Sequence, residues 1–124
     1  MNVCNFLNFQ GDKIIKGVKK IINKIDAHDL FEIAGHPSWS FLIIKDFNNY
    51  SSYKIKTLFL QEVFKNGIIT LGTHNMSFSH SDNDIKKLLD LYEVLLPMIF
   101  EAAKSNLIDN LLNCEPLQPL FKVR

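Results

Sequence analysis

The residues best suited to chemistry lie together in one polar segment, residues 72–84, with the sequence GTHNMSFSHSDND. The segment contains two histidines, two aspartates, two asparagines and several hydroxyl-bearing residues, and apolar stretches flank it on both sides. Side chains of these types can bind a metal ion, form a nucleophile–base–acid triad, or cap a turn and a helix. The spacing of the residues helps to separate these three alternatives.

The spacing of the histidines disfavours a metal site. His74 and His80 are six residues apart, so an extended chain separates them by roughly 20 Å, and a helix points them to different sides. Neither Cys4 nor Cys114 is near them in the sequence. A small zinc-binding regulator that uses these histidines is therefore the weakest alternative.

A triad of Ser77, His80 and Asp82 is disfavoured as well, because such triads are defined by geometry and sequence neighbours rarely point to a common centre. Ser81 followed by Asp82 and Asp84 is instead typical of a helix N-terminus. The serine caps the first backbone N–H groups there, and the aspartates meet the positive end of the helix dipole. Taken alone, the residues indicate no catalytic machinery.

The composition fits one domain, residues 1–124, with a formal net charge of +1 and 47% hydrophobic residues. A near-neutral charge argues against nucleic-acid and membrane-surface partners, and no apolar run approaches the roughly 18 residues of a membrane span. The lysines of residues 13–24 are interpreted as the solvated face of a helix. Two distant cysteines and the lack of a signal peptide predict free thiols in a reducing cytoplasm.

Hydrophobic periodicity predicts an α+β fold, a small, mostly antiparallel sheet covered by helices. Pro97 is expected to kink or break the last long helix. The predicted elements are a helix at 3–25, strands at 30–35 and 38–47, a helix at 51–67 that Ser51 or Ser52 caps, a short strand at 68–71, and a helix at 81–104.

Four short motifs occur in a characteristic order. They are a Gly-x-Pro-x-Trp turn between the two strands, a Gly-Ile pair after the second helix, the loop SFSHS, and an Asp-Ile helix opening; their residues are Gly35–Pro37–Trp39, Gly67–Ile68, 77–81 and Asp84–Ile85. In this order they resemble the C-terminal small domain of class III pyridoxal-phosphate (PLP) aminotransferases, in the branch that resembles glutamate-1-semialdehyde aminomutase. The resemblance covers nearly the whole chain.

The resemblance implies that the chain belongs to a longer, homodimeric enzyme. In that family a preceding large domain carries the lysine that forms the Schiff base with PLP, so this chain alone would hold no cofactor and be inactive. The aminomutases have a longer loop with a Phe-Glu pair where this chain has GTHNMS, at 72–77. We therefore expect an aminotransferase, with the aminomutase and a stand-alone α+β interaction module as alternatives.

The resemblance also implies roles for individual residues. The loop after the short strand faces the cleft in the family, so His74 and Asn75 are the candidates for substrate contact. His80 is expected to hydrogen-bond the loop to the sheet, and Ser81 to cap the helix that follows. Trp39, at the start of an apolar strand, is expected in the core or at the interface between domains.

Overall fold

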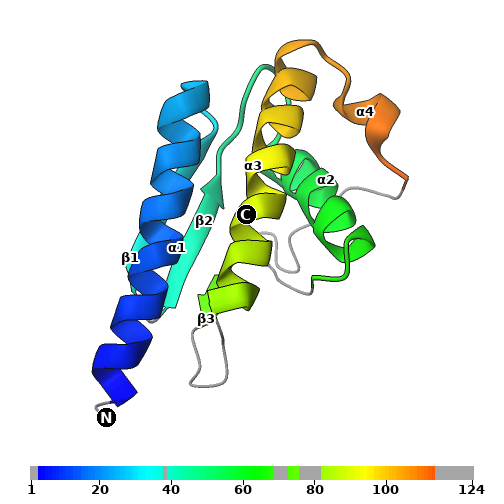
Figure 1. The fold of residues 1–124 in the computed structure, drawn as a ribbon. Coiled ribbons are helices and arrows are strands. Elements are labelled where there is room, and N and C mark those ends of the chain that lie inside the picture. The colour runs from blue at the N-terminus through cyan, green and yellow to red at the C-terminus, as the bar shows by residue number, and fades with distance from the viewer. Residues whose placement is uncertain (1–2, 38, 69–72, 76–81, 114–124) are drawn as a thin grey trace, which may run out of the picture.

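The computed structural model describes residues 3–37, 39–68, 73–75 and 82–113. Figure 1 shows long helices packed with a small sheet. In chain order the elements are α1 (Val3–Ile25), β1 (Phe31–His36), β2 (Trp39–Ile44), α2 (Ser52–Lys65), β3 (Thr73–Asn75), α3 (Asp82–Lys104) and α4 (Ile108–Leu111).

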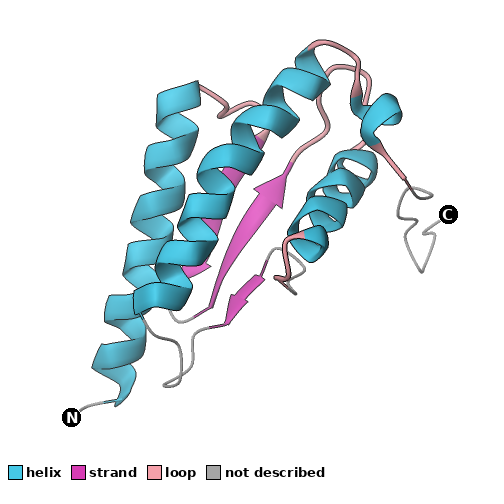
Figure 2. Cartoon of the chain, turned by 45° about the vertical axis from the view of Figure 1, so that its right-hand side comes forward, coloured by secondary structure: helices cyan, strands magenta, loops and turns pink. Residues whose placement is uncertain are grey.

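The sheet is antiparallel throughout, with the strand order β1–β2–β3 among the described residues. Helices α1 and α3 lie side by side across one face of the sheet, and α3 separates α1 from α2 (Figures 1 and 2). The predicted α+β class and the antiparallel sheet are thus confirmed.

The two faces of the sheet differ in burial. Residues paired across neighbouring strands share a face, so Phe31, Ile33 and Leu42 point to the side of the helices, where all three are buried. The alternate positions point to the other side, where Trp39 is 53% exposed and Ile43 38% exposed. We call the first side the inner face and the second the outer face.

The predicted helices agree closely with the structure. The expected helices at 3–25, 51–67 and 81–104 correspond to α1, α2 and α3, each within two residues at either end. Ser51 is the residue that caps α2, because its hydroxyl accepts a hydrogen bond from the backbone N–H of Lys54 at 3.2 Å. The two predicted long strands correspond to β1 and β2, but β2 ends at Ile44 rather than at residue 47.

One prediction about an individual element was wrong, and two others are tested only in part. The third strand is β3, at residues 73–75, inside the polar segment for which a loop is expected. Of the predicted strand at 68–71, Ile68 is not in a strand and the rest lies outside the described residues. Helix α3 continues through Pro97, so the expected break does not occur there, and the alternative of a kink stays a prediction. The carbonyl that loses its partner there is that of Glu93, on an exposed side of the helix where water can bond it.

Gly11 lies inside α1 because the helix approaches the β1–β2 hairpin closely there. A Cβ atom at position 11 would overlap the carbonyl oxygen of Pro37 in the hairpin turn. Gly35, just before that turn, has φ of 100°, a conformation that glycine adopts without strain. Gly11 therefore sets how closely α1 rests on the hairpin, and Gly35 supplies the backbone conformation before the turn.

Candidate functional site

His74 lies in the middle of β3 and is only 5% exposed. Its Nδ1 atom is 3.1 Å from the hydroxyl of Ser40 on β2, and its Nε2 atom is 2.8 Å from the hydroxyl of Tyr92 on α3. A neutral imidazole has one N–H and one bare nitrogen, and each hydroxyl can donate or accept, so both ring nitrogens are satisfied. This Ser40–His74–Tyr92 network joins the sheet to α3.

Burial controls the ionisation of this network. Loss of hydration lowers the pKa of His74 from 6.5 to about 4, because the cationic imidazolium is the form that burial disfavours. Burial likewise raises the pKa of Tyr92 above its usual value. Both groups are neutral near pH 7, and the network is a set of neutral hydrogen bonds in the core.

The predicted site residues do not gather at one place. His74 points into the core, so a substrate contact by its ring would require breaking one of its two hydrogen bonds. In the β2–β3 register Asn75 pairs with Trp39. Because Trp39 is on the outer face, Asn75 occupies an outer-face position of β3. His80 and Ser81 lie outside the described residues, and their predicted roles as loop anchor and helix cap stay predictions.

Trp39 is not a core residue, which corrects one of its two expected placements. It stands on the outer face, and its ring lies 5.2 Å from the ring of Phe41, two residues further along β2. Ile43 continues the same row, and Ala34 on β1 pairs with Phe41. The outer face therefore presents a row of apolar side chains in which Trp39 and Ile43 are exposed and Phe41 is half-buried.

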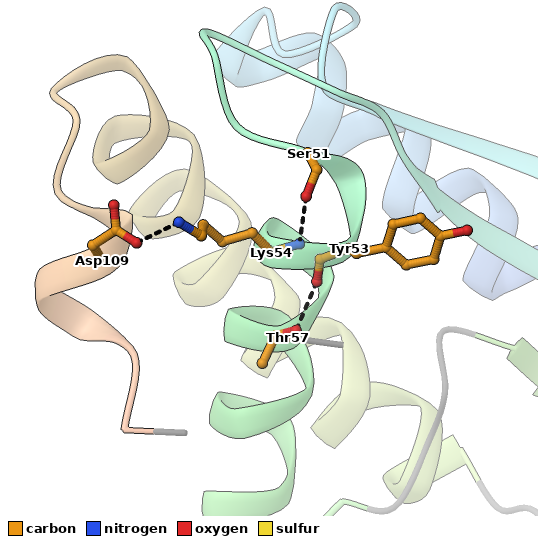
Figure 3. Close-up of polar contacts among 5 residues, drawn as sticks. All are labelled: Ser51, Tyr53, Lys54, Thr57 and Asp109. Atoms are coloured by element: carbon orange, nitrogen blue, oxygen red, sulfur yellow. Dashed lines mark hydrogen bonds and ion pairs between the residues drawn. The ribbon is translucent and has the colours of Figure 1, made fainter. Parts of the chain in front are cut away.

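Polar contacts hold the C-terminal part of the described chain to α2. Lys54 reaches Asp109 of α4 at 2.6 Å, as Figure 3 shows, and Gln61 donates to the backbone carbonyl of Leu111 at 2.9 Å. In the same picture the hydroxyl of Thr57 donates to the carbonyl of Tyr53, one turn earlier in α2. These contacts join α4 and the residues after it to α2.

None of the lysines in the described part of the chain is buried. Seven of them pair with carboxylates within 4 Å, and the side chains of all seven pairs are partly or largely solvated. A Schiff-base lysine needs a cleft that excludes water and a group that keeps its amine neutral.

Comparison of the chain with protein-family models, with curated proteins and with solved structures gives no match. Among the described residues no three histidine, cysteine, aspartate or glutamate side chains converge as metal ligands. In that same part of the chain, no helix combines the length and the apolarity needed to cross a bilayer.

Sequence reasoning missed two features of the structure. It did not find the partners of His74, although a tyrosine within the apolar stripe of a long helix signals a buried hydroxyl that needs one. It also did not find the exposed row on β2. The strand sequence WSFLII is apolar at both odd and even positions apart from Ser40, so it does not show which face meets solvent.

Proposed function

We propose that this chain is the C-terminal small domain of a PLP-dependent class III aminotransferase. In the parent enzyme it closes one side of the cleft where an amino group passes between an amino donor and a keto or aldehyde acceptor. The chain alone is inactive. The outer face of the sheet is the observation that carries the proposal, together with the order of motifs that resembles this family.

The outer face has the character of a docking surface. Solvated faces of antiparallel sheets normally carry polar side chains, whereas Trp39, Phe41 and Ile43 form an apolar row here. Exposed apolar patches on small domains mark contact sites. Trp39 is 53% exposed. Burying its indole ring against a partner would contribute favourable free energy, because large aromatic side chains dominate the energetics of interfaces.

The roles divide between this chain and the rest of the parent. PLP, held by the large domain, supplies the electron sink for amino-group transfer. The small domain supplies a wall that excludes water from the cleft. The Ser40–His74–Tyr92 network joins β3 to β2 and to α3.

The test compares this chain with a longer chain that also includes the residues encoded upstream of it. PLP is added to both, and absorbance at the edge of the visible range reports an internal aldimine. We expect the band only with the longer chain. If the gene has no upstream reading frame, or its longer product leaves PLP unchanged, the proposal is refuted.

Trp39 gives a second, independent readout because it is the only tryptophan of the 124 residues. In the longer chain, subtracting the fluorescence emission of the Trp39→Phe variant from that of the wild type gives the emission of Trp39 alone. We expect the difference spectrum to lie further to the blue than the emission of the isolated chain. An unshifted spectrum would favour the stand-alone interaction module. A separate experiment, the identification of the reaction products of the longer chain, would distinguish an aminotransferase from an aminomutase.

A further inference from the structure

Strand β1 is an edge strand among the described residues, because β2 is its one neighbour in the sheet. The backbone N–H of Lys45 donates to the carbonyl of Leu30 at 2.8 Å, in the register that continues through the hairpin. In an antiparallel pair, hydrogen-bonded positions alternate. Glu32 and Ala34 therefore bond to β2, and the backbone N–H and C=O of Ile33 point away from it, to the free edge.

A groove of about 460 Å³ runs beside this edge, between β1 and the last turns of α1. Phe31, Glu32 and Ile33 all line it, although their side chains alternate between the two faces of the sheet. The groove therefore follows the edge of the strand rather than one face. Its base is apolar, formed by Ile22 of α1 together with Phe31 and Ile33, all buried.

The rim of the groove carries an excess of positive charge. Lys45 pairs with Glu32 at 3.7 Å and also donates to the carbonyl of His28 at 3.1 Å. Lys19 of α1 lines the groove as well, and within the described part of the chain it forms no ion pair. One cation is thus left over beside a free strand edge and an apolar base.

We propose that this groove binds an extended acidic peptide segment, which adds to β1 as a further strand. The peptide backbone bonds to the N–H and C=O of Ile33, one apolar side chain rests on the base of the groove, and an acidic side chain on the same side of the peptide pairs with Lys19. Free edge strands take up peptides in this manner, with main-chain bonds for affinity and a pocket for selectivity. The proposal does not depend on the proposed enzymatic function.

The probe is the peptide Thr-Glu-Thr-Val-Thr-Glu-Thr, acetylated and amidated at its ends. As a strand it presents one valine and two glutamates on a single side. The matched control peptide has proline in place of valine, which keeps the charge and opposes the strand. Backbone amide exchange of the full chain is followed by NMR with each peptide.

We expect the amide of Ile33 to exchange quickly in the isolated chain and slowly with the valine peptide. The amides of Glu32 and Ala34, which bond to β2, are protected throughout and serve as internal controls. Lys19→Glu should weaken binding of the valine peptide roughly tenfold. Lys20→Glu, one residue further on the same helix and outside the groove lining, should leave binding unchanged.

Three results would overturn the inference. In the first, the valine peptide at millimolar concentration leaves the exchange of Ile33 unaltered, or the proline peptide protects it equally well. In the second, Lys20→Glu weakens binding as much as Lys19→Glu. The loss of affinity would then come from the overall charge of the protein and not from a pairing with Lys19. In the third, Ile33 becomes protected without peptide as the protein concentration rises, which identifies a second copy of the chain as the occupant of the edge.

Discussion

The buried histidine makes the stability of this fold depend on pH in a way that can be worked out from the structure. The unfolded chain protonates His74 near its ordinary pKa of 6.5, whereas the folded chain protonates it only near about 4. Between these values the unfolded state binds more protons, so acidification favours unfolding. The contribution of His74 is fully present above about pH 6.5 and is lost as the pH falls toward 4.

From these two pKa values, lowering the pH from about 7 to about 5 removes about 2 kcal/mol of unfolding free energy through His74 alone. Urea titrations followed by far-ultraviolet circular dichroism measure this loss as a fall in the midpoint of roughly 1 to 2 M. His74→Gln is the comparison protein, because glutamine can bond to the same hydroxyls and does not titrate. Its midpoint should fall by less between the same two pH values.

The comparison of the two proteins isolates one group. His28 and His36 are exposed and common to both proteins, so their effects cancel. Asp82 cancels as well: its hydrogen bond from Lys13 lowers its pKa, so its contribution is lost only as the pH falls into the acidic range of carboxylates. If the wild type and His74→Gln lose stability in parallel between pH 7 and pH 5, the assignment of a buried neutral histidine is refuted.

Three further predictions use the same urea titrations at neutral pH. Tyr92→Phe leaves a ring nitrogen of the buried histidine without its partner and should cost about 1–3 kcal/mol, whereas Tyr53→Phe, on the exposed side of α2, should cost almost nothing; equal losses would contradict the network. Gly11→Ala drives a methyl group into the carbonyl of Pro37 and should cost about 1–3 kcal/mol, and an unchanged midpoint would show that α1 does not rest there. Asn48→Gly keeps the positive φ of 48° but removes the side-chain amide that bonds the last carbonyls of α3, so a loss of about 1 kcal/mol is expected, and none if α3 is capped otherwise.

The sequence determined the helices and the first two strands of this protein. The apolar stripe of α1 and α3, the cap at Ser51 and the turn signals at Gly35 and Gly67 are local features, and they predicted elements close to those observed. Local patterns succeed here because a helix face or a turn is specified by residues within a few positions of one another.

Only the tertiary structure decided what His74 and Trp39 do. The histidine stands in a polar stretch that indicates an exposed loop, yet three residues of that stretch pair with β2 as β3, and this pairing turns the imidazole toward Tyr92, eighteen residues away. Trp39 stands in an apolar strand that indicates the core, yet the pleat and the position of α1 and α3 on the inner face leave it in solvent. A one-residue change of register would exchange the two faces, so burial at these positions is a property of strand pairing and not of composition.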